Sequence, residues 1–216
     1  NTMLNIIRPH EPSSLTSYRQ QPDAKYDGPL FTPVKSDIRE ALVISQGYLC
    51  AYCMQRISND RSTTKIEHWQ CQHTYSQRQL DFTNMFAVCQ GTTQDQLHCD
   101  SSKGKQKITI DPASRSQLVE SYIRYTNSGE IYVQDNDLLN NELNKILNLN
   151  HSRIKNNRQA VLKAVTTQLS KYRGTVSKSE LQGLLSKWSS IDAENKKIPY
   201  SAVAIFYLKN KLLKAS

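Results

Sequence analysis

The chain has 216 residues, of which 28 are Lys or Arg and 19 are Asp or Glu, so that its formal net charge is +9. At about 150 residues per domain, this length predicts one domain with an appendage or two small domains. Hydrophobic residues make up 38% of the chain, and no run of them is predicted to form a membrane span or a secretory signal region. The 7 Gly and 7 Pro exclude a collagen-like or low-complexity chain.

The first 34 residues are expected to form an extended arm. Four prolines interrupt residues 1–30, and a proline disfavours helical backbone at the residue before it. A helix is then predicted from Ser36, which can cap its first turn, to about Gln46. Gly47 is expected to end this helix, because glycine readily adopts the left-handed conformation found after helix C-termini.

Residues 48–112 are dense in Cys, His, Asn, Trp and Tyr and show little long apolar periodicity. Such a segment is expected to build little core by itself and to depend on a bound metal for its stability. Thr63, Thr64, Lys65 and Ile66 form a short run with β propensity, which predicts a strand that ends near residue 68.

The character changes again after residue 112. Residues 122–125 and 131–133 predict a β-hairpin around a turn at Gly129. The remaining predicted elements are helices with apolar residues at a period of 3.6, at 137–148, 151–173, 178–190 and 200–214. The sequence therefore predicts an α+β fold in three parts, which are the arm (1–34), a metal-supported module (35–112) and a hairpin with a basic helical region (113–216).

The five cysteines are an odd number, which argues against a secreted disulfide framework. Cys50 and Cys53 form a C-x-x-C pair, and Cys89 and Cys99 form a second pair with nine residues between them. Tetrahedral zinc takes four thiolate or imidazole ligands, commonly in two close pairs. The four cysteines therefore predict a structural Zn²⁺ site in a reduced, cytoplasmic chain.

Two other residues leave the zinc ligand set open. His98 could replace Cys99, and Cys71 could replace any of the four cysteines. The alternative to a zinc site is a group of free, buried cysteines.

The positive charge is concentrated in the last part of the chain. Residues 113–216 hold 16 basic and eight acidic residues, whereas residues 1–112 hold 12 and 11. Such an excess indicates a polyanionic partner, of which nucleic acid is the commonest. A solvated, lysine-rich helical surface would have the same composition, so charge alone leaves both interpretations open.

A histidine beside a carboxylate follows the predicted strand. The Glu67 carboxylate can bind a hard cation, and the His68 imidazole can take a proton from water. Asn84 follows after a gap of 15 residues, and Asp100 directly follows the last zinc candidate. Because these polar residues alternate with the cysteines, we expect the zinc to bring His68, Asn84 and Asp100 together.

This order of residues resembles that of the HNH endonucleases, the ββα-metal nucleases with a supporting zinc. It is most similar to the HNH nuclease subunits of Septu and retron-linked bacterial antiphage systems, the PtuB group. The motifs that carry the resemblance are Cys-Ala-Tyr-Cys at 50–53, Ile-Glu-His at 66–68, Asn84 before Cys89, Cys-Asp-x-x-Lys-Gly at 99–104 and Asp-Pro at 111–112.

The resemblance implies roles for individual residues. His68 would be the general base that activates water, and Asn84 would hold the loop and orient the His68 imidazole. Glu67 and Asp100 would hold a catalytic divalent cation. Asp100 stands where the family usually has a histidine, and a carboxylate at this place favours Mg²⁺ over softer ions.

The resemblance also implies partners. Lys103 and Lys105 would contact nucleic acid, either DNA or RNA, through its phosphates. A separate, PtuA-like ATPase subunit would complete a hetero-oligomeric complex without a membrane partner. The function implied is phosphodiester hydrolysis by a metal-dependent HNH endonuclease, and the alternative is a non-catalytic, zinc-containing nucleic-acid-binding or adaptor subunit.

Overall fold

The computed structural model describes residues 5–93 and 96–215. The helices are α1 (Ser13–Arg19), α2 (Phe31–Ser45), α3 (Asp100–Lys103), α4 (Val119–Tyr122), α5 (Asp137–Asn141), α6 (Ser152–Leu169), α7 (Lys178–Ser189) and α8 (Ser201–Lys214), with the short turns η1 (Ser76–Arg78), η2 (Phe82–Asn84) and η3 (Glu142–Ile146). The strands are β1 (Thr64–His68), β2 (Met85–Cys89), β3 (Thr92–Thr93), β4 (Gln96–Leu97), β5 (Ile123–Tyr125) and β6 (Ile131–Val133). The fold is thus α+β, as the sequence predicts.

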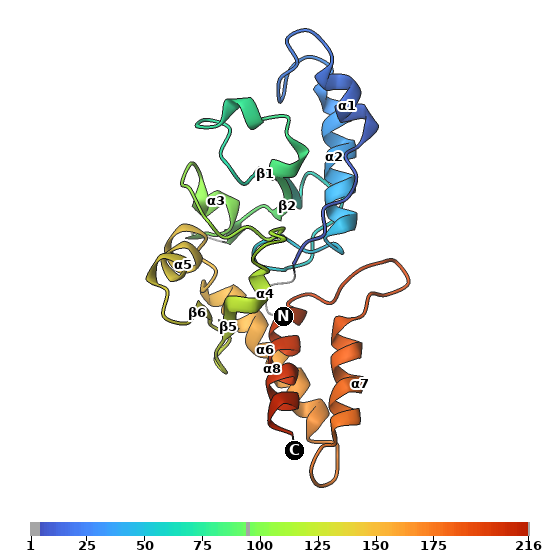
Figure 1. The fold of residues 1–216 in the computed structure, drawn as a ribbon, viewed down its shortest axis with the longest axis vertical. Coiled ribbons are helices and arrows are strands. Elements are labelled where there is room, and N and C mark those ends of the chain that lie inside the picture. The colour runs from blue at the N-terminus through green and yellow to red at the C-terminus, as the bar shows by residue number, and fades with distance from the viewer. Residues whose placement is uncertain (1–4, 94–95, 216) are drawn as a thin grey trace.

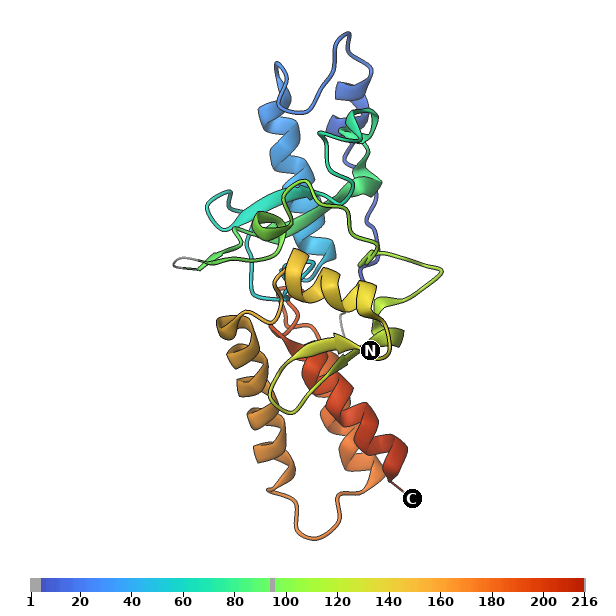
Figure 2. The same cartoon turned by 90° about the vertical axis from the view of Figure 1, so that its left-hand side faces the viewer.

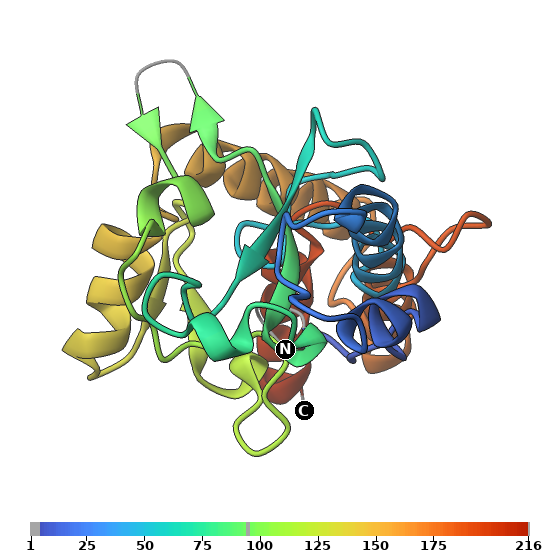
Figure 3. The same ribbon diagram turned by 90° about the horizontal axis from the view of Figure 1, so that it is seen from above.

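The elements form two ends of an elongated molecule. Figure 1 shows α1, α2, β1 and β2 at one end and α6, α7 and α8 at the other. The hairpin of β1 and β2 lies between α2 and α3, as the views in Figures 1 and 3 agree. At the other end α8 contacts α6, α7 and β5 (Figure 2).

The segment expected to be an extended arm contains a helix. In α1, Leu15 and Tyr18 are buried, and their spacing of three residues places them on the same helix face. The Tyr18 ring packs against Phe31 at the start of α2, with ring centroids 5.0 Å apart. Helix α1 has only seven residues and two buried apolar side chains, too short a pattern for the sequence to show its period.

Helix α2 begins at Phe31, before the predicted start at Ser36. Leu30 precedes it with a φ of 61°. Pro33 lies within the first turn, where the missing N–H has no acceptor inside the helix and costs nothing. The helix ends at Ser45, and Gly47 follows with a φ of 62°, as predicted.

The antiparallel pair β1–β2 forms the centre of the first end. Thr64 is paired with Cys89 and His68 with Met85, and all five residues of β2 are buried. The other edge of β2 is closed by Gln46, whose side-chain amide both accepts from the N–H of Ala87 and donates to its carbonyl. Residues 48–112 thus contribute far more core than their composition suggests.

The predicted hairpin after residue 112 is present as β5 and β6, with Gly129 in its turn. Gly129 has a φ of 83°, and a Cβ there would lie 2.5 Å from the carbonyl oxygen of Lys155, so glycine is required. Asn140 and Asn150 close the outer edge of β6 through bonds to the backbone of Val133 and Ile131.

The predicted helices at 151–173, 178–190 and 200–214 are present as α6, α7 and α8. The predicted helix at 137–148 is divided, because the π turn η3 follows α5. Glu142 in this turn is 2% exposed, and its carboxylate accepts from the N–H groups of Thr109 and Ile110. Within residues 5–93 and 96–215, no helix combines the length and apolar character of a membrane span.

Two apolar clusters make up the interior. The larger one joins α1, α2, β1, β2, the β5–β6 hairpin and the start of α8. The smaller one lies between α6, α7 and α8 and includes Val165, Leu181, Leu184, Trp188 and Leu208.

Candidate metal and catalytic centre

Four cysteines converge in the structure, as the sequence predicts. Cys50, Cys53, Cys89 and Cys99 are buried, and their sulfur atoms all lie within 4.8 Å of one another. The Cys50–Cys99 and Cys53–Cys89 sulfur pairs are each 3.9 Å apart. Sulfurs bonded at about 2.3 Å to one tetrahedral zinc would be about 3.8 Å apart, whereas a disulfide measures about 2.05 Å. The cluster could therefore hold a metal ion such as zinc.

Local structure positions the first three ligands. Cys50 and Cys53 lie in a tight turn that is closed by the bridge between Leu49 and Arg56. Cys89 is the last residue of β2. The turn is joined to the strand by a backbone bond from Ala51 to Ala87, so the sulfurs of Cys50, Cys53 and Cys89 are fixed to one hairpin.

Cys99 has an unusual backbone conformation just before α3. Its φ is 55° and its ψ is −135°, a region that a side chain makes costly, by about 1–3 kcal/mol. Its N–H donates to the carbonyl of Leu147 at 2.8 Å. A residue remains in such a conformation only where its surroundings impose it, and a bond from its sulfur to a metal would add such a constraint.

The protonation of the thiols fits a cluster that needs a cation. Burial raises the pKa values of the Cys53 and Cys99 thiols. Burial also opposes ionisation of Cys50, but hydrogen bonds from the other three thiols outweigh it and lower the pKa of Cys50. A bound metal deprotonates its thiol ligands outright, which removes the cost of burying these groups without a counter-charge.

The two alternative ligands occupy different places. His98 is close to the cluster, with Nδ1 3.3 Å from the Cys99 sulfur and 3.9 Å from the Cys89 sulfur, and its ring packs near that of His151. Cys71 is partly exposed and lies outside the group of four cysteines that could hold a metal ion. The four predicted cysteines thus form one group that could hold a metal ion, with His98 beside it.

A second polar cluster lies where β1 ends and α3 begins. The Lys103 ammonium is 2.7 Å from Glu67 Oε1 and donates to the carbonyl of His68 at 3.2 Å. The side chains of Lys103 and Glu67 are only 1% and 5% exposed. A buried ion pair of this kind is costly to break, because the remaining charge would lack a partner.

Glu67 shares its surroundings with a second carboxyl group. Burial raises the pKa of Glu67 well above its usual range, and the hydrogen bond and charge of Asp100 raise it further, while Lys103 opposes this shift. The hydroxyl of Tyr52 also donates to Glu67 Oε1, at 3.2 Å. Carboxylate oxygens are the ligands that Mg²⁺ prefers, so Glu67 and Asp100 fit such an ion, with Lys103 as a competing counter-charge.

His68 is held in one orientation. Its Nε2 is 2.9 Å from the carbonyl oxygen of Gln79, and because a carbonyl only accepts, Nε2 carries the proton. In the neutral ring, Nδ1 is therefore the basic nitrogen. Burial lowers the pKa of His68, which keeps the ring neutral near pH 7.

The ring of Tyr26 covers His68. The two rings meet edge to face with centroids 4.6 Å apart, and the N–H of Tyr26 donates to the side chain of Gln79 at 3.0 Å. His68 is only 6% exposed, so its imidazole is largely shielded from solvent.

Asn84 holds the loop that connects β1 with β2. Its Oδ1 accepts from the N–H of Gln70 at 2.8 Å, and its Nδ2 donates to the carbonyls of Gln70 and Arg78 at 3.0 and 3.4 Å. These three bonds end on the loop backbone and not on the imidazole, so Asn84 acts on His68 through the loop that carries Gln79.

The two lysines expected to contact phosphates differ in position. Lys103 is buried against Glu67 and presents no charge to solvent, because its ammonium is committed to the ion pair. Lys105 is exposed and remains available to a polyanion. A lysine that the sequence did not single out, Lys65, lies 3.8 Å from Asp100 and donates to Ser101 at 2.7 Å.

Besides Lys65, sequence reasoning missed Tyr26, Tyr52 and Gln79 in this centre. Tyr52 could have been found from its place inside the Cys-Ala-Tyr-Cys turn, which the cysteines tie to β2. Tyr26 and Gln79 carry no local signal, since each reaches His68 from a separate loop.

Compared with the models of known protein families and with the curated proteins, the chain matches none of them.

Proposed function

We propose that this chain is a metal-dependent nuclease of the HNH, or ββα-metal, class. The observation that carries the proposal is the arrangement of β1, β2 and α3. Glu67 and His68 end β1, Asn84 directly precedes β2, and Asp100 begins α3. Lys103 bonds both Glu67 and the backbone of His68, so one polar centre joins the strand with the helix.

The proposed chemistry assigns the base to His68. Its Nδ1 takes the proton of the attacking water, while the Gln79 carbonyl fixes the opposite ring nitrogen. Asn84 is a positioning residue that keeps this loop in place. Mg²⁺ held by Glu67 and Asp100 would supply charge stabilisation at the scissile phosphate and the leaving oxygen.

Zinc is proposed as the structural ion of the four-cysteine cluster. It would tie Cys99, the residue before α3, to the end of β2 and to the Cys50–Cys53 turn. In this way zinc binding sets the position of Asp100, the next residue along the chain. The further proposal, which the resemblance supplies, is an effector in bacterial antiphage defence that works with a separate ATPase subunit.

One observation favours the alternative, a non-catalytic zinc-containing adaptor or nucleic-acid-binding subunit. Glu67 is satisfied by Lys103 and Tyr52, and His68 is covered by Tyr26. A polar cluster that is buried and fully hydrogen-bonded can have a purely structural role, which is to position the backbone. An activity assay distinguishes the two functions.

The test is cleavage of plasmid DNA and of total RNA by the purified chain, alone and with any ATPase that co-purifies, with and without Mg²⁺. We expect His68→Ala to lower the cleavage rate by about 10²–10⁴-fold, with zinc content and nucleic-acid affinity unchanged. Asp100→Ala should lose activity that excess Mg²⁺ partly restores. His10→Ala is the matched control, since His10 is exposed.

Two outcomes contradict the proposal. Wild-type rates in His68→Ala would exclude His68 as the base. Absence of cleavage by the wild type under every condition, with binding retained, would favour the adaptor function.

A further inference from the structure

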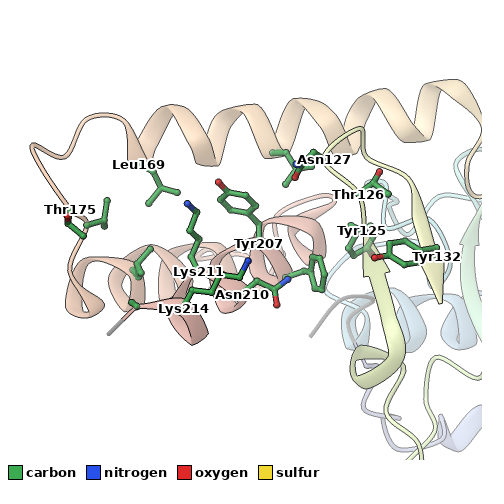
Figure 4. A pocket seen from close by; sticks show the side chains of 15 residues that line it. Tyr125, Thr126, Asn127, Tyr132, Leu169, Thr175, Tyr207, Asn210, Lys211 and Lys214 are labelled. Atoms are coloured by element: carbon green, nitrogen blue, oxygen red, sulfur yellow. The ribbon is translucent and has the colours of Figure 1, made fainter. Parts of the chain in front are cut away.

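A groove separate from the polar centre lies between α6, α8 and the β5–β6 hairpin (Figure 4). Its volume is about 700 Å³, within the range of about 300–1,000 Å³ typical of ligand sites. Four aromatic residues line it, namely Tyr125, Tyr132, Phe206 and Tyr207. The rings of Tyr125 and Phe206 meet edge to face with centroids 5.9 Å apart.

The charge of the groove has one sign. Lys211 and Lys214 line it, and none of its described lining residues is Asp or Glu. The Lys211 ammonium lies 5.7 Å from the centre of the Tyr207 ring, and Figure 4 shows both side chains extending from α8. A positive charge and an aromatic ring are therefore offered side by side to an anionic ligand.

Polar groups in the groove can both donate and accept hydrogen bonds. The amides of Asn127 and Asn210 line it, and a side-chain amide provides a donor and an acceptor together. The edges of nucleobases present both kinds of group. An acidic peptide would satisfy the two lysines, but it would leave the aromatic rings without flat partners.

We propose that this groove binds single-stranded nucleic acid. Unstacked bases pack on the aromatic rings, foremost Tyr207, while Lys211 and Lys214 contact the phosphates. Aromatic platforms beside a positive groove are the usual means of binding single strands. The base faces of a duplex are covered by stacking, so a double strand cannot use the rings.

This inference rests on the proposed nuclease function, since it names the substrate class. Binding and cleavage can nevertheless fail separately. Affinity measured without added Mg²⁺ tests the groove, and cleavage by His68 variants tests the catalytic centre.

The experiment measures binding of the full-length chain to a labelled 12-nucleotide oligo(dT) and oligo(U), and to a 12-base-pair duplex, by fluorescence anisotropy. We expect tighter binding of at least one single strand than of the duplex. Tyr207→Leu keeps an apolar side chain but removes the ring, and it should weaken single-strand binding about tenfold. Tyr207→Phe should restore the affinity, because the ring returns.

The lysine variants test the phosphate contacts. Lys211→Gln should weaken binding and reduce the slope of log K against log salt by about 0.7. Lys187→Gln is the matched control, because Lys187 is exposed on α7 and does not line the groove. Unchanged helical content and Trp188 fluorescence exclude misfolding as the cause.

Three results would overturn the proposal. They are equal affinity for duplex and single strands, wild-type affinity in Tyr207→Leu, and an equal effect of Lys211→Gln and Lys187→Gln. Binding of a poly-Glu peptide as tight as that of the oligonucleotides, with the same losses in the variants, would identify an acidic-peptide site instead.

Discussion

The cysteine region, residues 46–112, and the helical bundle, α6 with α7 and α8, are held together by different interactions. The cysteine region has short strands, and side chains complete its backbone bonding, as Gln46 does at Ala87 and Asn84 at Gln70. The bundle packs apolar side chains of three long helices around Val165 and Leu208. The stability of the cysteine region therefore depends on a few specific side chains, whereas the stability of the bundle is the sum of many small apolar contacts.

The chain carries a natural probe in each region, because it has only two tryptophans. Trp69 follows β1 and donates to the carbonyl of Ile110 at 2.9 Å. Trp188 lies on α7 and donates to Gln168 at 3.0 Å. The Trp69→Phe variant keeps only Trp188 and therefore reports on the bundle. The Trp188→Phe variant keeps only Trp69 and reports on the cysteine region.

The largest effect is expected at the metal cluster. Purified protein should contain one zinc per chain, and Cys50→Ser should lose it together with the fixed environment of Trp69. The reason is that metal binding and folding are coupled, and a structural zinc contributes about 10–16 kcal/mol of binding free energy, as much as an entire domain's stability. Trp188 fluorescence and the helical circular dichroism should be largely retained.

Cys71→Ser is the control for this experiment, since Cys71 is partly exposed and lies outside the cluster. It should retain zinc, which elemental analysis measures. Simultaneous loss of both tryptophan signals in Cys50→Ser would mean that the two regions form a single cooperative unit. A Cys50→Ser variant with full zinc content would exclude the four-cysteine site.

A smaller loss is expected for Asn84→Ala. The substitution leaves the N–H and carbonyl of Gln70 without their partners, and each unsatisfied group costs about 1–3 kcal/mol. We expect destabilisation of about 3 kcal/mol, detected by urea unfolding at Trp69. An equal shift of the urea-unfolding transition measured at Trp188 would show that the substitution destabilises both regions equally.

The next effect concerns the contact between the β5–β6 hairpin and the bundle, where Tyr125 of β5 meets Phe206 of α8. Burial raises the pKa of Tyr125 from 10.0 to about 12. Below pH 10 the hydroxyl is neutral in both the folded and the unfolded chain. Between pH 10 and 12 only the unfolded chain ionises, so this residue's contribution to stability, about 2–3 kcal/mol for two pKa units, is lost as the pH rises.

Tyr125→Phe should flatten the decline in unfolding free energy between pH 10 and 12, compared with its own value at pH 8. Denaturant titration at several pH values measures this slope. Tyr172→Phe is the matched control, because Tyr172 follows α6 and is only partly buried. A slope unchanged by Tyr125→Phe would contradict the burial of this hydroxyl.

The sequence predicts the bundle well and the cysteine region in part. The period of Leu181, Leu184 and Trp188 suffices to predict α7, because an apolar stripe needs no information from other segments. The start of α2 could not be predicted, since Pro33 is compatible with a helix only once its first turn is known. The core formed by β2 could not be predicted, because a continuous apolar run of five residues does not distinguish a buried strand from a piece of a buried helix.

The candidate site was predictable where ligands occur in chemically distinctive patterns. Four cysteines in two pairs point to one cluster even with nine residues between Cys89 and Cys99. The surroundings of His68 were not predictable, because Gln79 reaches it from 11 residues away and Lys103 from 35 residues away. Which lysine becomes buried depends on how α3 is oriented, and no local pattern encodes this.

The smallest effect is expected at the start of α7, where the bundle has a reciprocal cap. The Ser177 hydroxyl accepts from the N–H of Glu180 at 3.3 Å, and Glu180 accepts from the N–H of Ser177 at 2.7 Å. Removing a serine cap costs about 1 kcal/mol, so Ser177→Ala should shift the Trp188 transition slightly and leave Trp69 unchanged. Ser186→Ala, on an exposed turn of the same helix, should be neutral, since alanine favours helix. Equal effects of the two substitutions would mean that local propensity, and not the cap, stabilises α7.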